Sequence, residues 1–267
     1  MNKKYHYAED DIANAFNEIG LKKGDNVFIH SNLGFFGTLK NAKYPHNYYH
    51  AFKNEILNII GDGGTLITPT FSYSYCHDEI FIPESTPGVG GYFSDMIMKE
   101  TKAIRSVDGN FSIVAIGNLA GFFTKYPPEH SFGKNSFWER FLKSNGKFVN
   151  LNFDAGSTFI HYVEKTLNVP YRFDKIFSGS SMINGKKITG VFYHFVYDLS
   201  KPNNAPDFTK FDNKTKETGL AKRVNLGKGQ IVSITAQDTF NLIKSELQSN
   251  PSFLIKGKLI QYENRIR

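Results

Sequence analysis

A histidine and a glutamate three residues apart are the residues of this chain whose types and spacing first suggest chemistry. His161 and Glu164 fall where the pattern predicts a helix, so both side chains emerge on one face. A neutral imidazole, with an ordinary pKa of about 6.5, accepts a proton near neutral pH. A neighbouring carboxylate fixes its tautomer and stabilises the imidazolium. The pair suits a general base with its orienting partner, or it is an ordinary surface pair on a helix.

The segment before this pair predicts the elements that position it. Residues 147–153 are short and rich in β-branched and aromatic residues, which predicts a buried strand. After a break at residues 154–156, Ser157 or Thr158 is expected to start the helix by accepting hydrogen bonds from its free amides. We therefore expect the pair near the carboxyl end of a strand, where open α/β sheets bind their ligands.

Strands and helices alternate over the first two-thirds of the chain, and the final third no longer follows this alternation. Strands are expected at 26–30, 65–68 and 113–116, and helices around 12–19, 48–60, 93–98, 118–123 and 138–142. The final third predicts a hairpin strand at 185–197, a polar loop at 201–213, a strand at 230–234 and a helix at 236–248. This order predicts an α/β fold with a layered mixed β-sheet, helices on both faces and a β-rich C-terminal third, in a single domain over 1–267.

Composition and charge narrow the class of partner. With 40% apolar and 21% charged residues among 267, the chain has the composition of a folded protein. A net charge of +7 favours anionic partners, but the 32 basic residues are scattered and form no nucleic-acid-binding motif. Small phosphorylated ligands are therefore favoured, and nucleic acid is not.

Neither a secretory signal nor a membrane span is expected, so the sequence predicts a cytoplasmic protein that does not bind a membrane. The N-terminus has no apolar run, and no stretch approaches 18 apolar residues. The single cysteine, Cys76, excludes an internal disulfide and a multi-cysteine metal site. It is a nucleophile or an unreactive thiol.

Two loops are candidates for ligand binding. The strand at 26–30 leads into a polar, glycine-containing turn at 31–37, which is a backbone cradle for phosphate or an ordinary turn. The long segment that follows Ser72 carries Tyr73 and Tyr75 and is expected to be a binding loop. Its aromatic rings stack on a base or sugar, or they anchor the loop.

Six motifs, in order along the chain, resemble the aminoglycoside 3-N-acetyltransferase family. They are Leu21–Asp25, Ile29–Leu33, Gly64–Phe71, Arg105–Ser112, Phe132–Ser136 and Thr158–Glu164. The resemblance covers about residues 18–172 and returns weakly at 219–254. It implies an enzyme, an acyltransferase that uses acetyl-coenzyme A or another acyl-coenzyme A to acylate an amine on an amino sugar, without a metal.

The resemblance also assigns catalytic roles. His161 and Glu164 fall on the family's active-site His-x-x-Glu. It implies that His161 deprotonates the sugar ammonium, directly or through water, and that Glu164 orients the imidazole. The amine then attacks the thioester in a ternary complex, without a covalent acyl-enzyme.

Coenzyme contacts follow from the same resemblance. The expected contacts are the turn residues His30, Ser31, Asn32, Leu33 and Gly34, with Thr70, Arg105, Ser106, Val107 and Ser112 lining the same groove. Backbone amides there can hold pyrophosphate and the developing oxyanion. Arg105 is a phosphate contact or an ion-pair partner at the edge of the core.

One departure from the family pattern concerns a third catalytic candidate. Where aminoglycoside-modifying members typically read His-Pro-x-His-Ser, this chain reads Asp108-Gly-Asn-Phe-Ser112, without either histidine. Asp108 accepts a hydrogen bond from the substrate amine or from His161, or it is a turn residue beside Gly109.

Charge guides the choice of acceptor. Aminoglycosides are polycations and favour carboxylate-rich sites, whereas this chain is basic. The sequence therefore favours a nucleotide-linked or polysaccharide-precursor amino sugar, with an aminoglycoside antibiotic, and hence resistance, as the alternative. A non-catalytic sugar- or nucleotide-binding protein is a different class. A metal hydrolase lacks a third ligand at suitable spacing. A homo-oligomer is left open.

Overall fold

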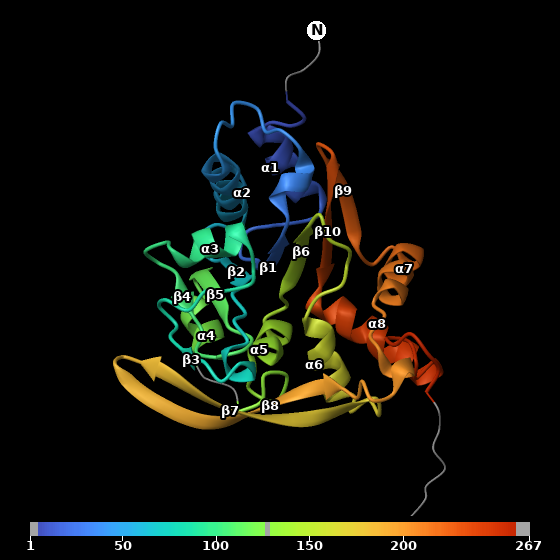
Figure 1. Cartoon of the computed structure of the whole chain (residues 1–267). Helices are drawn as coiled ribbons and strands as arrows, with labels where there is room; N and C mark the ends of the chain where they lie inside the picture. Colours follow the sequence, from blue (N-terminus) through green and yellow to red (C-terminus); the bar gives the residue numbers. More distant parts are fainter. Residues whose placement is uncertain (1–4, 126–128, 260–267) are drawn as a thin grey trace, which may run out of the picture.

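The computed structural model of the protein describes residues 5–125 and 129–259. Its centre is a seven-stranded mixed sheet with the strand order β4-β5-β2-β1-β6-β10-β9 (Figure 1). The strands are β1 (Asn26–Ser31), β2 (Thr65–Pro69), β4 (Ile104–Arg105), β5 (Ile113–Gly117), β6 (Lys147–Leu151), β9 (Lys222–Leu226) and β10 (Gly229–Thr235). β1 lies between β2 and β6 and is parallel to both, whereas the other pairs are antiparallel.

Helices cover both faces of this sheet. Alternate residues of each strand point to opposite faces, and both sets are apolar, so both faces must be buried. Val27 and Ile29 of β1 belong to one hydrophobic cluster, and Phe28 belongs to the other. The first cluster packs under α1 (Glu9–Glu18), α2 (Pro45–Ile60) and α3 (Tyr92–Met98). The second packs under α4 (Ala120–Thr124), α5 (Phe137–Lys143), α6 (Phe159–Thr166), α7 (Thr209–Thr218) and α8 (Ala236–Ser249). The expected layered α/β fold is confirmed.

A long hairpin forms a second sheet at one end of the molecule (Figure 1). β7 (Arg172–Ile183) and β8 (Lys186–Tyr197) pair antiparallel, and β3 (Ile80–Phe81) joins β7. The two-residue turn Asn184-Gly185 has positive φ at both positions, which asparagine and glycine tolerate and which suits the twist of paired strands. The sequence pattern predicted β8 but not β7, although this dipeptide is a hairpin signal.

Three local expectations need correction. The polar loop at 201–213 is partly helical, with η3 (Pro202–Asn204) and the first turn of α7, and β9 was not predicted. At the start of α6 neither Ser157 nor Thr158 caps with its side chain; the amides of Ile160 and His161 bond to the backbone carbonyl oxygens of these two residues. Within residues 5–125 and 129–259, no helix is both long and apolar enough to cross a membrane.

Candidate active site

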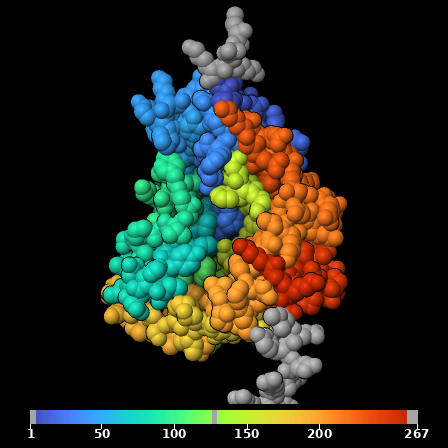
Figure 2. Space-filling model, turned by 45° about the vertical axis from the view of Figure 1, so that its right-hand side comes forward, coloured from blue at the N-terminus to red at the C-terminus, as the bar shows by residue number. Residues whose placement is uncertain are grey.

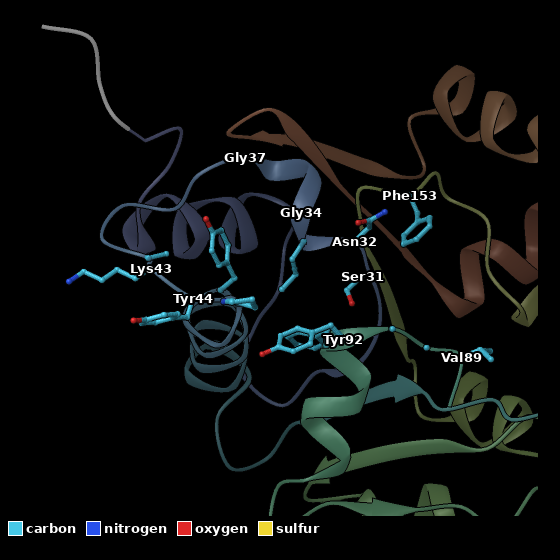
Figure 3. A pocket seen from close by; sticks show the side chains of 16 residues that line it. Ser31, Asn32, Gly34, Gly37, Lys43, Tyr44, Val89, Tyr92 and Phe153 are labelled. Carbon is cyan, nitrogen blue, oxygen red and sulfur yellow. The ribbon is translucent and has the colours of Figure 1, made fainter. Parts of the chain in front are cut away.

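A cavity of about 710 Å³ opens where β1 ends. The turn that the sequence predicted, Ser31 to Gly34, lines it, and η1 (Leu33–Phe36) continues from this turn. Side chains from α2, α3 and the segment after β6 complete the wall, with Tyr48, Tyr92 and Phe153 among them. In Figure 3, Ser31, Asn32 and Phe153 lie at one end of the cavity and Lys43 and Tyr44 at the other.

The chemistry of this lining suits an elongated ligand with an anionic and an aromatic part. Three tyrosines, Tyr44, Tyr48 and Tyr92, offer ring faces, and Lys43 offers a positive charge. A Cβ built on Gly34 would meet no atom within 4 Å, so the backbone here is accessible to a ligand. A Cβ on Gly90 would instead overlap the carbonyl oxygen of Pro69, which fixes that wall against β2.

His30 comes directly before this turn, and its side chain lies on the face of β1 that carries Phe28 rather than on the face that carries Val27 and Ile29. Its Nδ1 is 2.9 Å from Oδ1 of Asn150 on the neighbouring strand β6. The amide nitrogen of Asn150 donates to the carbonyl oxygens of Asp154 (2.5 Å) and Gly156 (3.1 Å). Burial lowers the pKa of His30, which keeps its imidazole neutral at neutral pH.

The predicted pair of His161 and Glu164 is present on α6, together with a residue that the sequence analysis did not include. His161 Nδ1 lies 3.3 Å from Glu164 Oε2, but Nη2 of Arg172 is closer, at 2.7 Å. Glu164 has no exposed surface, and its carboxylate also meets Nε of Arg172 at 3.3 Å and the Tyr197 hydroxyl at 3.1 Å. Arg172 and Tyr197 are paired across the β7–β8 hairpin. Tyr197 therefore lies beside Glu164 through the pairing of β8 with β7, the strand that was not predicted.

These contacts keep His161 neutral. Burial lowers its pKa, the Arg172 guanidinium lowers it further, and Glu164 opposes this by a smaller amount. The positive charge of Arg172 therefore offsets the Glu164 carboxylate, which was expected to stabilise an imidazolium at His161.

Asp108 occupies a buried turn. Its Oδ1 accepts the backbone N–H groups of Asn110 and Phe111 at 2.9 Å each, and its Oδ2 accepts the Ser131 hydroxyl at 2.8 Å. Phe132 packs 5.3 Å from the His161 ring, between centroids. No hydrogen bond joins Asp108 to His161 in the described part of the chain.

Arg105 holds a loop rather than facing the cavity. Its guanidinium donates to Thr70, Ser112 and the carbonyl oxygens of Pro83 and Thr86, and burial lowers its pKa to about 10. These bonds fasten the segment between β2 and α3 to β4, on which Arg105 lies. Ser106 accepts the Ile113 amide, and the residues that line the cavity do not include Thr70, Arg105, Ser106, Val107 or Ser112.

A smaller cavity of about 420 Å³ lies on the other side of Phe153, which lines both. It is lined by three basic residues, Lys216, Arg223 and Lys228, and by Asp154 and Asp212. Figure 2 shows this face hollowed where the lime segment after β6 lies between the blue-to-teal first half and the orange C-terminal third.

Two other sequence candidates take no part in this site. Cys76 is exposed as a residue, but partial burial of its thiol raises the pKa, which disfavours the thiolate. Residues 5–125 and 129–259 hold no cluster of three potential metal ligands.

Comparisons place the chain beside known proteins. The family model described as aminoglycoside 3-N-acetyltransferase matches residues 28–248. Among solved structures, sisomicin-bound AAC-VIa has a TM-score of 0.78 at 17% identity, over 91% of this chain and 98% of that chain. AAC-IIIb with CoASH has a TM-score of 0.76 at 18% identity, over 90% and 97%. Apo AAC(3)-IVa has 0.75 at 20% identity, over 95% and 93%. At these identities the structures share the fold. A search of curated proteins found no match.

Proposed function

The chain belongs to the aminoglycoside 3-N-acetyltransferase family and is an acyltransferase, and from this premise we propose that it transfers an acetyl group from acetyl-coenzyme A to an amine of an aminoglycoside. The cavity at the end of β1 is the observation that carries the proposal, because the turn matched to the family's coenzyme site lines it. We assign the catalytic centre to α6, on the resemblance stated for His161 and Glu164. In this proposal residues 1–267 act as one catalytic domain.

The coenzyme occupies the larger cavity. The turn from Ser31 to Gly34 faces its anionic part, and Lys43 lies at the other end of the cavity. Tyr44, Tyr48 and Tyr92 offer surfaces on which a purine ring can stack. The contacts of Arg105, Thr70 and Ser112 are already made within the protein, so we restrict the proposed coenzyme contacts to the turn and this cavity.

His161 and Glu164 act at the reacting centre. A substrate ammonium must lose a proton before its nitrogen can attack a thioester, and a neutral imidazole is suited to the proton chemistry of that step. Burial and Arg172 support the neutral form of His161. Asp108 is left with a structural role, because one of its oxygens accepts two amides of its own turn and the other accepts the Ser131 hydroxyl.

A nucleotide-linked amino sugar is the second candidate acceptor. The smaller cavity supports it, because Lys216, Arg223 and Lys228 outnumber the two carboxylates there. Lys216 and Arg223 share Asp212, at 2.5 and 2.8 Å, so this support rests largely on Lys228. A pyrophosphate would suit such a lining better than a polycation does.

Thiol release from acetyl-coenzyme A tests the proposal, with an aminoglycoside and a nucleotide-linked amino sugar offered separately to the purified protein. We expect release with the aminoglycoside. Release with the nucleotide sugar alone would favour the second candidate, and release with neither would contradict the enzymatic proposal. His161→Ala should abolish turnover and keep coenzyme binding, whereas a binding module would have no turnover to lose.

A further inference from the structure

The chain leaves the central sheet at Asn152, the first residue after β6. Its backbone is left-handed, with a φ of 63°, a conformation that asparagine tolerates better than most residues with a Cβ. β6 lies between β1 and β10, and both neighbours still pair with it up to this point. The amide of Asn32 donates to the carbonyl oxygen of Leu151, and the amide of Asn152 donates to the carbonyl oxygen of Gln230, each at 2.9 Å.

The side chain of Asn152 takes the place of the peptide group that the strand withdraws. If β6 continued, the next peptide N–H, that of Phe153, would donate to the Asn32 carbonyl oxygen on the β1 side. The carbonyl oxygen of Asn152 would accept the Gln230 amide on the β10 side. Instead, Nδ2 of Asn152 donates to the Asn32 carbonyl oxygen at 2.8 Å. Its Oδ1 accepts the Gln230 amide at 3.0 Å, so one carboxamide completes both ladders.

The surroundings of this carboxamide are shaped to hold it. Its two bonds fix its orientation, because the amide nitrogen only donates and the amide oxygen only accepts. A Cβ built on Gly229 would lie 1.9 Å from Oδ1 of Asn152, so glycine at the start of β10 makes room for the side chain. The carboxamide of Asn152 is therefore a built part of the sheet edge.

This bond joins the lining of one cavity to the lining of the other. Asn32 lines the larger cavity, Asn152 lines the smaller one, and Phe153, the next residue, lines both. A trans peptide is planar, so holding the carbonyl oxygen of Asn32 also sets the direction of the Leu33 N–H, which points the opposite way. Asn152 thus sets the peptide plane at the centre of the turn from Ser31 to Gly34.

We propose that Asn152 is a positioning residue for the coenzyme, because its carboxamide holds the turn from Ser31 to Gly34 in the conformation that binds. This inference rests on the proposed function, which puts the coenzyme against that turn. Neither of the nearest substitutes can do the same work. Aspartate lacks the donor for the Asn32 carbonyl oxygen, and glycine lacks both the donor and the acceptor.

The expected effect is on affinity rather than on the chemical step. Without the carboxamide, the turn adopts other conformations, and the apparent affinity falls with the fraction of molecules in which the turn remains in place. The net contribution of one hydrogen bond shifts such an equilibrium by about two- to tenfold. Once the coenzyme is bound, the turn is in place again, so kcat changes little.

Asn152→Gly tests the proposal, because glycine keeps the left-handed backbone and removes the carboxamide. Asn145→Gly is the matched control. Asn145 precedes the other end of β6, has a φ of 54° and is exposed, and its side chain makes no hydrogen bond within residues 5–125 and 129–259. Isothermal titration with coenzyme A gives the Kd, and steady-state rates give KM and kcat.

We expect Asn152→Gly to raise the Kd for coenzyme A and the KM for acetyl-coenzyme A by at least about threefold. Its kcat should stay within about twofold of the wild-type value, because the bound complex is the same. Asn145→Gly should match the wild type in all three constants. A Kd in Asn152→Gly equal to that of the control, or a loss of kcat at unchanged Kd, would overturn the proposal.

Hydrogen exchange followed by NMR gives a second test that needs neither turnover nor a bound coenzyme. The Asn32 amide, which is bonded to Leu151, should exchange faster in Asn152→Gly and at the wild-type rate in Asn145→Gly. In the wild type, the side-chain amide of Asn152 should be protected by its bond to Asn32. An unprotected side-chain amide there would overturn the inference even if the variant did not fold. Absence of coenzyme binding to the wild type would instead count against the proposed function.

Discussion

The buried pair of Glu164 and Arg172 should make Arg172→Met one of the most destabilising single substitutions in this protein. The side chains of both residues are nearly inaccessible, at 0% and 2% exposed. Removing the cation leaves Glu164 buried without its charge partner, which typically costs about 3–5 kcal/mol. The carbonyl oxygen of Phe195 also loses its donor from Nη1. Methionine keeps the apolar stem over the Tyr197 ring, so cavity formation adds little.

Urea denaturation measures this prediction, and the only tryptophan, Trp138, reports on the core because it is 1% exposed. We expect the free energy of unfolding to fall by about 4 kcal/mol in Arg172→Met. Adding Glu164→Gln removes the stranded charge and should restore at least about half of that loss. Lys165→Met is the matched control, because its ion pair with Asp174 is 24% and 39% exposed and should be worth under about 1 kcal/mol.

Two results would refute this reasoning. Equal losses in Arg172→Met and Lys165→Met would mean that burial does not set the strength of the pair. A double variant no more stable than Arg172→Met would mean that the cost comes from packing rather than from the uncompensated charge.

Three further predictions follow from the cavity, the histidines and the hairpin. Gly34→Asp should fold normally, because its Cβ meets no atom, yet raise the KM for acetyl-coenzyme A about tenfold or more through repulsion of phosphate, with Gly34→Ala near wild type. Burial lowers the pKa of His194 to about 4, so below about pH 6.5 the unfolded chain binds the proton first and stability falls toward pH 4. As the pH is lowered from 6.5 toward 4, the urea midpoint of His194→Gln should therefore fall less steeply than that of the wild type. The same dependence of the midpoint on pH in both proteins would contradict this. Gly179→Ala would overlap the Tyr75 ring and should cost about 1–3 kcal/mol, whereas Gly190→Ala, its hairpin partner, meets Phe192 only at 3.4 Å. Equal urea midpoints for these two variants would remove the packing argument.

Local patterns determined much of the fold from the sequence. The strands at 26–30 and 113–116 and the helix at 236–248 appear close to their predicted bounds, because each is a continuous apolar or amphipathic segment. The turn at Ser31 also lines a cavity as expected, since a polar turn after a buried central strand must lie at the sheet edge. The hairpin strand β7 was missed, although its Asn184-Gly185 turn was readable.

The spacing of His161 and Glu164 was a local property, and the sequence by itself fixed their shared helix face. The charged and polar groups around the histidines come from segments that are distant in the sequence. Arg172 and Tyr197 reach Glu164 only through the β7–β8 pairing, and Asn150 reaches His30 only through the pairing of β6 with β1. The sequence thus determined which residues are candidates for the chemistry, and the tertiary structure decided which polar and charged groups surround each histidine, because those contacts join segments far apart in the chain.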